Sequence, residues 1–261
     1  MIIDYWLSEE ASDGITLDIL KDDVVVRRYH NAADGEVESM EQGMRGPFRA
    51  AARVGNLDTE QGLNRFQWDF SVDGPQRADG SIAGRLRAVP GNYTVRIAIG
   101  TWMAEQEFSL LPDPDVIEEG VSLMDLEEQY DLAMHILELM GAAADLVDRI
   151  DDLLRNAPEE VETPHTGRRD RRRRVAEAEA NPVHELEEVR AQLVTDNSDS
   201  YPPPMLQSQI SYLRSMVMAA DQHPGNQAYD RLDVLRSEYE TLLRRVNMAE
   251  ETLREVGTHQ E

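Results

Sequence analysis

Short apolar runs with strand-like character fill residues 1–112. Two of them alternate clearly: Phe66, Trp68 and Phe70 share one face of Leu63–Phe70, and the odd positions of Tyr93–Ile99 are apolar. A period of two is typical of strands with one buried face. Gly, Asp and Pro clusters separate these runs from four others, which are Ile2–Leu7, Ile15–Leu20, Val24–Tyr29 and Met103–Leu110. The spacing predicts an antiparallel sandwich of about seven strands, whereas residues 31–62 predict a long loop with room for one edge strand.

The second half of the chain has a different period. Pro112 and Pro114 end the last strand-like run, residues 113–121 predict a hinge, and Ser122 opens a Ser-x-x-Asp sequence that resembles a helix-capping box. Apolar residues then recur at steps of three and four, a heptad pattern typical of coiled coils and antiparallel bundles. The first seam comprises Leu123, Leu126, Tyr130, Ala133, Leu137, Met140, Ala144 and Val147; the last comprises Ala228, Leu232, Leu235, Tyr239, Leu242, Val246, Ala249, Leu253 and Val256.

Two shorter amphipathic stretches lie between the heptad seams. One follows Asn181-Pro182, which is typical of a helix start, and the other follows Pro202–Pro204. The connector 221–225 is short, so we expect the last two helices to be antiparallel neighbours. The predicted fold class is therefore α+β multidomain. It comprises an N-terminal immunoglobulin-like (Ig-like) antiparallel β-sandwich over 1–112, a hinge over 113–121, an elongated antiparallel bundle of three or four helices over 122–257, and a tail over 258–261.

Charge and composition exclude several classes of function. Asp and Glu number 51 against 26 Lys and Arg, which gives a formal net charge of -25. A general nucleic-acid binder, or a protein that docks on anionic lipid, needs a basic face instead. Cysteine is absent, which excludes disulfides, thiolate metal sites and a cysteine nucleophile. No apolar run approaches the roughly 20 residues of a membrane span, and no signal peptide is visible.

Familiar catalytic motifs are incomplete. The chain has no Gly-rich phosphate loop, and Ser81 lies one place too early within Gly80–Gly84 to form the G-x-S-x-G elbow. His184 begins a sequence like H-E-x-x-H, but Glu188 stands where the second histidine belongs. We therefore predict no cofactor, no designed metal site and no catalytic residue.

One basic cluster interrupts the acidic chain. It consists of Arg168, Arg169, Arg171, Arg172, Arg173 and Arg174. The cluster predicts either a patch that contacts an acidic partner or a solvated segment that pairs with the surrounding glutamates. The excess of glutamate favours the solvated segment.

Three tryptophans and one aspartate are candidates for contact with glycans. Trp6, Trp68 and Trp102 could stack on sugar rings, although we expect tryptophans chiefly in the core. Asp69, beside Trp68, is the candidate carboxylate for glycoside hydrolysis, which needs one carboxyl group in a partly apolar cleft. The alternative for Asp69, which we favour, is an aspartate that stabilises a turn or a strand end.

The order of several motifs resembles one family. Gly62–Phe70 (GLNRFQWDF) and Val89–Ile97 (VPGNYTVRI) look like the G-L-x-R-F-x-W-D and P-G-x-Y-T-V-R strands near the C-terminal end of large bacterial exoproteins. Those proteins carry sortilin-like β-propellers of BNR repeats and are often labelled glycosyl hydrolases. The strands at 3–29 resemble the opening of the same Ig-like module, and the helices that contain Ser122–Leu132 and Leu206–Gly225 resemble its helical tail.

The resemblance implies an interaction role without catalysis. In that family the propeller would carry any hydrolase chemistry, and this chain has no Asp-box repeat of the propeller type. We therefore predict a non-catalytic interaction or scaffold module that binds a protein partner, such as a β-propeller exoprotein, or itself through the heptad helices. The alternative is a glycan-active or glycan-binding accessory domain. The resemblance also implies an exported or periplasmic location.

Overall fold

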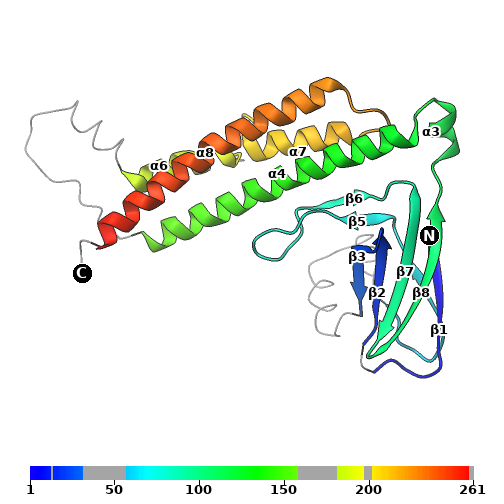
Figure 1. Cartoon of the computed structure of the whole chain (residues 1–261). Coiled ribbons are helices and arrows are strands. Elements are labelled where there is room, and N and C mark those ends of the chain that lie inside the picture. Colours follow the sequence, from blue (N-terminus) through cyan, green and yellow to red (C-terminus); the bar gives the residue numbers. More distant parts are fainter. Residues whose placement is uncertain (13, 32–56, 158–180, 197–201, 259–261) are drawn as a thin grey trace, which may run out of the picture. The chain divides into compact units, whose positions relative to one another are not determined.

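The computed structural model describes residues 1–12, 14–31, 57–157, 181–196 and 202–258, with strands first and helices after them (Figure 1). The predicted α+β class is therefore confirmed. Contacts divide the chain into two compact units. Met1–Asp73 and Arg85–Glu127 form the sandwich unit, and Gly74–Gly84 and Glu128–Glu261 form the helical unit. Because Gly74–Gly84 packs with the helices, the chain passes between the units three times.

The strands of the sandwich unit pair only in antiparallel fashion. A four-stranded sheet has the order β3-β2-β7-β8, while β1 pairs with β4 and β5 pairs with β6. The bounds are β1 Ile2–Leu7, β2 Thr16–Lys21, β3 Val24–His30, β4 Gly62–Gln67, β5 Ser71–Asp73, β6 Arg85–Arg87, β7 Gly91–Ile99 and β8 Trp102–Leu110. Six of these strands coincide with the predicted apolar runs. Most of the segment 31–62, with its expected loop, lies outside the described residues.

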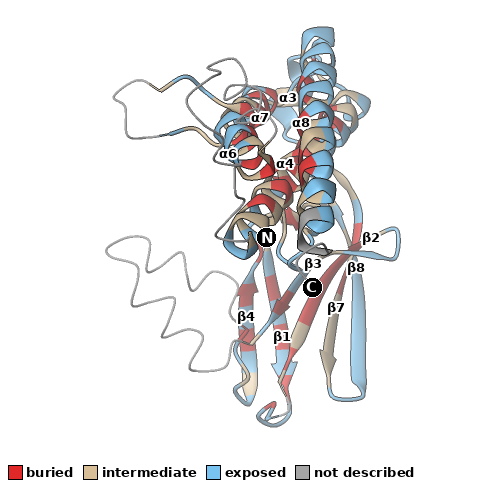
Figure 2. Cartoon of the chain, turned by 90° about the vertical axis from the view of Figure 1, so that its left-hand side faces the viewer, coloured by how far each residue is buried: buried red, intermediate tan, exposed pale blue. Residues whose placement is uncertain are grey.

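An aromatic cluster forms the centre of the sandwich. Trp68 is fully buried, and its ring centroid lies 5.9 Å from that of Tyr93 on β7 and 6.0 Å from that of Phe108 on β8. On β3, the ring of Tyr29 lies 4.6 Å from that of Phe66 on β4. These contacts join the two-stranded β1-β4 sheet to the four-stranded sheet. Figure 2 shows the resulting alternation of buried and exposed residues along β1 and β4.

Two details refine the predicted sandwich. The Tyr93 hydroxyl donates a hydrogen bond of 2.7 Å to the carbonyl oxygen of Val89, which is the tyrosine corner of Ig-like sandwiches. The prediction that Phe70 continues the alternation of Phe66 and Trp68 is wrong. β4 ends at Gln67, and Phe70 has φ +62°, a left-handed conformation that ends the strand.

Five helices follow the sandwich strands in the described residues: α3 Pro114–Glu118, α4 Leu123–Asn156, α6 Pro182–Leu193, α7 Leu206–Val217 and α8 Asn226–Thr258. Helix α3 occupies the segment 113–121 in which we expected only a hinge, and the Asp113 carboxylate caps it by accepting from the amide of Asp115. The predicted start at Ser122 is confirmed, since the Ser122 hydroxyl accepts from the Asp125 amide at 3.1 Å. No helix in the described part of the chain has the length and apolar character needed to cross a membrane.

The helical unit contains three rods. Along α4, contacts run from Asp151 with Arg190 of α6, through Ala143 with Gln207 of α7, to Gln129 with Val217. In this series of contacts the residue numbers decrease along α4 while they increase along α6 and α7. Helices α6 and α7 therefore form one interrupted rod antiparallel to α4 (Figure 1). Arg245 of α8 contacts Glu185, and Arg231 contacts Gln209. The predicted antiparallel packing of α7 and α8 is therefore confirmed, and α4 and α8 are parallel.

Part of each heptad seam is buried between these helices. On α8, Leu232, Leu235 and Val246 are buried, as the seam predicts. The buried face of α4 is wider than one seam, because eight residues outside the seam are also buried. They are Gln129, Leu132, Ile136, Leu139, Gly141, Ala143, Leu146 and Ile150. Self-association through the heptad helices stays a prediction, since several seam positions, which include Leu123 and Tyr239, are exposed or only half-buried in the single chain.

The excursion Gly74–Gly84 adds a fourth layer against α4. A methyl group added at Gly74 would lie 2.7 Å from a Leu137 methyl carbon, and one added at Gly84 would lie 2.9 Å from the other. Next to them, the Arg77 guanidinium donates to the carboxylates of Asp145 at 3.0 Å and Asp148 at 2.6 Å. Two small residues and one ion-pair cluster thus hold the excursion to the helix.

Candidate functional site

The structure separates the sequence-predicted candidates. The arginine cluster 168–174 lies outside the described residues. Trp68 is fully buried and its indole nitrogen donates to the Ser71 carbonyl oxygen at 3.0 Å, so its ring has no face to offer a sugar. The prediction that Trp68 could contact a glycan is therefore wrong. Trp6 is 70% exposed and Trp102 is 53% exposed, and both remain candidates for ligand contact.

Asp69 has the geometry of a turn-stabilising residue. Its carboxylate accepts hydrogen bonds from the Ser71 hydroxyl at 2.6 Å and from the Ser71 amide at 3.0 Å. Partial burial acts to raise the pKa of Asp69, but these two hydrogen bonds and the positive charge of Arg27 together outweigh it, so the pKa lies below its usual value. A general acid for glycoside hydrolysis needs the opposite shift. The arrangement therefore favours the structural role for Asp69.

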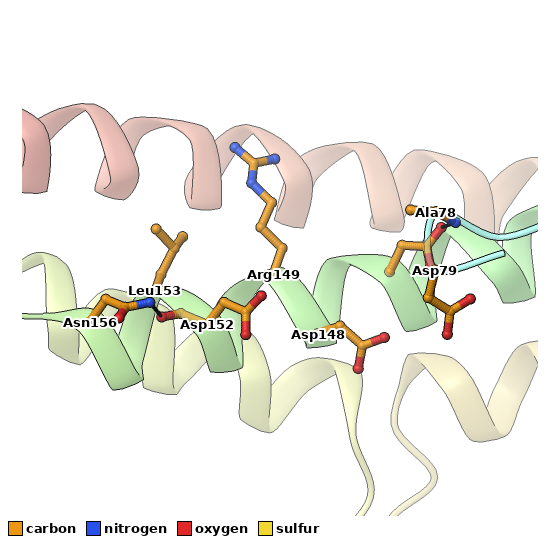
Figure 3. A pocket seen from close by; sticks show the side chains of 8 residues that line it. Ala78, Asp79, Asp148, Arg149, Asp152, Leu153 and Asn156 are labelled. Carbon is orange, nitrogen blue, oxygen red and sulfur yellow. Dashed lines mark hydrogen bonds between the residues drawn. The ribbon is translucent and has the colours of Figure 1, made fainter. Parts of the chain in front are cut away.

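One pocket of the helical unit is lined by acidic residues. Asp79 of the excursion lies near Asp145, Asp148 and Asp152 of α4, while Arg149 points toward α8 (Figure 3). Arg77 already binds two of these carboxylates, and Arg149 binds Glu250. No group of three or more His, Asp or Glu residues in the described ranges is arranged to hold a metal ion. The charged groups of this pocket therefore form ion pairs that link the excursion and α8 to α4.

A groove of the sandwich unit has a different character. It lies between β1 and β8, has a volume of about 530 Å³, and is floored by side chains of the sandwich interior. β1 contributes Ile3, Tyr5 and Leu7, whereas β7 and β8 contribute Val95, Ile97, Trp102, Ala104 and Phe108. The floor of the β1–β8 groove therefore joins buried side chains of β1 and Val95 to Trp102 and Ala104, which are exposed.

Exposure increases along the groove. Phe108 stacks on Tyr93 with centroids 5.7 Å apart, whereas Ala104 and Trp102, which face the same way on β8, are exposed. Figure 2 shows β8 exposed over most of its length. The start of β1 lies at the closed end, because Met1 pairs with Trp68, whose ring contacts Phe108. Trp6, near the end of β1, and Trp102, at the start of β8, therefore lie toward the open end.

Two unpaired strand edges border the groove. In the described residues β1 pairs only with β4, and β8 pairs only with β7. Natural edge strands are usually protected by Pro, Lys, bulges or inward-pointing charges. Neither strand contains Pro or Lys, neither shows a register shift, and the inward residues of β1 are all apolar. The barriers that these edges do carry are the charged side chains Asp4 on β1 and Glu105 and Glu107 on β8.

The charged side chains that line the groove are both acidic. Asp4 accepts two hydrogen bonds from Arg65, which lowers the pKa of its carboxyl group, and Glu105 accepts one from Arg96 at 2.6 Å. Burial raises the pKa of Tyr5 to about 12, so its phenol is neutral near pH 7 and donates to the Asp58 carbonyl oxygen. The floor is therefore uncharged, and the two acidic groups at its borders are each paired with an arginine.

Sequence reasoning identified Trp6 and Trp102 as candidates but did not connect them. The alternation of β1, in which Ile3, Tyr5 and Leu7 point inward, predicts that Trp6 points outward, whereas its placement relative to Trp102 depends on the pairing of strands. Comparison of the chain with family models, curated proteins and solved structures finds no match. The resemblance to sortilin-like BNR-repeat exoproteins therefore stays a prediction.

Proposed function

We propose that the chain is a non-catalytic interaction module whose β1–β8 groove binds an extended segment of a protein partner. The observation that carries the proposal is an apolar groove of about 530 Å³ between two strand edges that pair with no further strand in the described residues. Addition of a strand to an exposed edge is a common mode of peptide recognition, in which main-chain hydrogen bonds give affinity and side-chain pockets give specificity. Both elements are present in the groove.

An extended segment suits the groove better than a compact ligand. The groove runs along all six residues of β1, and its floor consists of apolar side chains with few polar groups to orient a small molecule. The resemblance to BNR-repeat exoproteins supplies a class for the partner, a secreted β-propeller protein, and we include it in the proposal.

Glycan binding is the second candidate, because Trp6 and Trp102 are both exposed toward the same end of the groove. Stacking of a sugar ring on an exposed tryptophan would need no strand edge. A glycan panel distinguishes the two. Glycan binding predicts a change in tryptophan fluorescence that Trp6→Ala and Trp102→Ala both abolish, whereas strand binding predicts no response to glycans.

The test of the proposed function is site-directed photocross-linking in the native cells. We expect a photoreactive phenylalanine in place of Ala104, in the groove, to trap a protein that the same residue in place of Ala219, an exposed position of the helical unit, does not trap. The trapped protein is then purified, and its affinity for the wild-type chain and for Trp102→Ala is measured.

We expect Trp102→Ala to weaken binding of the purified partner about tenfold, since aromatic residues in partly desolvated pockets are typical hot spots. Equal trapping at Ala104 and Ala219, or the same affinity for both chains, would contradict the proposal.

A further inference from the structure

We infer that the occupant of the β1–β8 groove is a basic, alternating strand that pairs antiparallel with the free edge of β1. The inference rests on the proposed function and specifies the chemistry of the partner segment. Three features of the groove support it: the direction of the backbone N–H and C=O groups of β1, the alternation of its side chains, and the sign of the charge at its open end.

The phase of β1 follows from its pairing with β4. Met1 and Trp68 exchange both backbone hydrogen bonds, at 2.8 and 2.9 Å. In an antiparallel ladder such pairs alternate with pairs that do not exchange hydrogen bonds. The odd residues of β1 therefore bond to β4, and the N–H and C=O groups of Ile2, Asp4 and Trp6 point to the free edge.

An added strand would continue the existing sheet. Every strand pair in the sandwich unit is antiparallel, and β1 offers three residues in phase for the same ladder. In such a strand every second side chain lies beside Ile3, Tyr5 and Leu7 and covers the groove floor, where Ala104 and Trp102 are exposed. The intervening side chains lie on the outer face beside Asp4 and Trp6. The occupant therefore alternates between apolar and polar residues over about six positions, the length of β1.

Charge complementarity specifies the flanks of the occupant. Glu9 and Glu10 follow β1 at the open end, and both are exposed. Asp4 and Glu105 along the borders are each paired with an arginine, while the whole chain carries a formal net charge of -25. A strand with Lys or Arg at the end beside Glu9 and Glu10 would meet opposite charge there, whereas an acidic strand would be repelled.

The probe is a synthetic peptide, Lys-Lys-Val-Thr-Val-Thr-Val-Thr-Lys-Lys, labelled with a fluorophore and titrated with the full chain. The matched peptides replace every Lys by Glu, or keep the composition and place the three valines together. We expect binding of the first peptide only, and a salt-dependent affinity because the flanking charges are exposed. Equal binding of the Glu-flanked or the valine-block peptide would overturn the inference.

Two variants isolate the backbone of β1. Asp4→Pro removes a free-edge N–H without removing a donor from the β1–β4 ladder, and Asp4→Ala removes the same carboxylate but keeps the N–H. We expect Asp4→Pro to bind the peptide about tenfold more weakly than Asp4→Ala does, the size of one lost hydrogen bond and its neighbouring distortion. Equal affinities would overturn the inference. If Asp4→Pro does not fold, Ile2→Pro against Ile2→Ala makes the same comparison.

The outcomes separate this inference from the proposed function. A partner trapped at Ala104 that binds Asp4→Pro and Asp4→Ala equally well leaves the interaction module standing and overturns strand pairing at β1. No trapped partner and no peptide binding overturns both. A dimer of the wild-type chain that Asp4→Pro dissociates assigns the edge to a second copy, and a glycan that displaces the peptide assigns it to a sugar; either result overturns the basic strand.

Discussion

The two units differ in how far their apolar surfaces are covered by neighbouring elements. In the helical unit the seam of α8 is covered by neighbouring helices, and α4 buries a face wide enough for the other rods and for the excursion Gly74–Gly84. In the sandwich unit the core is covered around Trp68 but open between β1 and β8. Within the described residues, the helical unit covers most of its seams, although Met216, Val234 and Met248 are exposed, whereas the sandwich unit has an apolar groove that no described strand covers.

The difference follows from how each element satisfies its backbone. A helix makes its hydrogen bonds internally, so packing of side chains is enough to complete a bundle. A strand leaves half of its hydrogen-bonding groups free unless a neighbour lies on each side. Within the described residues β1 and β8 each have one neighbour. A partner that adds to this chain therefore gains more at the sandwich edge than on the helices.

The largest effect on stability should come from substitution of Trp68, which lies where the sandwich core is fully covered. Trp68→Ala removes a fully buried ring in contact with Tyr93 and Phe108, and we expect a loss of about 3–5 kcal/mol in the free energy of unfolding. Trp102→Ala, at the open part, should change it by less than about 0.5 kcal/mol. Denaturant titrations followed by circular dichroism measure both. Similar losses for the two variants would mean that the groove is closed in solution.

A smaller effect is expected where the excursion packs on α4. Gly74→Ala would place a methyl group 2.7 Å from a Leu137 methyl carbon and 2.8 Å from the Gly84 carbonyl oxygen. We expect a destabilisation of about 1–3 kcal/mol from this overpacking. Gly225→Ala, where nothing lies within 4 Å of the added methyl group, is the control. Equal melting temperatures for the two variants would show that the excursion is not held against the helix.

The next effect concerns a buried polar contact within the bundle. The Gln129 amide is buried and donates to the carbonyl oxygens of Val217 and Ala220, both at 2.6 Å, at the end of α7. Gln129→Ala leaves both acceptors without this donor, and we expect a loss of about 1–2 kcal/mol. Hydrogen exchange should show faster opening of the α7 C-terminus in the variant. An unchanged exchange pattern there would show that Gln129 does not hold the end of α7.

The smallest effect is the pH dependence from Asp69. Its folded-state pKa is lowered, so its carboxylate stabilises the fold above the unfolded-state pKa, and this stabilisation is lost as pH falls through the folded-state value. Ser71→Ala removes the hydroxyl donor and should move the Asp69 pKa upward in an NMR titration of the carboxyl carbon. A pKa of Asp69 that is the same in both chains would assign the shift to another group.

The fold could be predicted from local periodicity to a large extent. Alternation over Phe66 and Trp68 indicates a strand with a buried face, and steps of three and four from Leu232 to Ala249 indicate a packed helix, because each pattern reports its own element. The left-handed turn at Phe70 and helix α3 were not predicted. Both depend on a single residue's conformation or on one capping carboxylate, which periodicity does not record.

The candidate site could not be predicted to the same extent. Trp6, Trp68 and Trp102 are equivalent in composition, and only the pairing of strands decides which ring is buried and which lies beside an unpaired edge. The attachment of the excursion to Leu137 depends likewise on two glycines and one leucine far apart in the chain. Contacts of this kind are set by topology, and a single sequence carries no local signal for them.

The most direct measurement is amide hydrogen exchange of the full chain, free and with the Lys-flanked alternating peptide, followed residue by residue by NMR. We expect fast exchange at Ile2, Asp4 and Trp6 in the free protein, slow exchange at Ile3 and Tyr5, and new protection of Asp4 and Trp6 when the peptide binds. Amides of α8 should not change. Protection of Asp4 and Trp6 in the free protein, or peptide-induced protection confined to the helices, would contradict an open strand edge as the binding site.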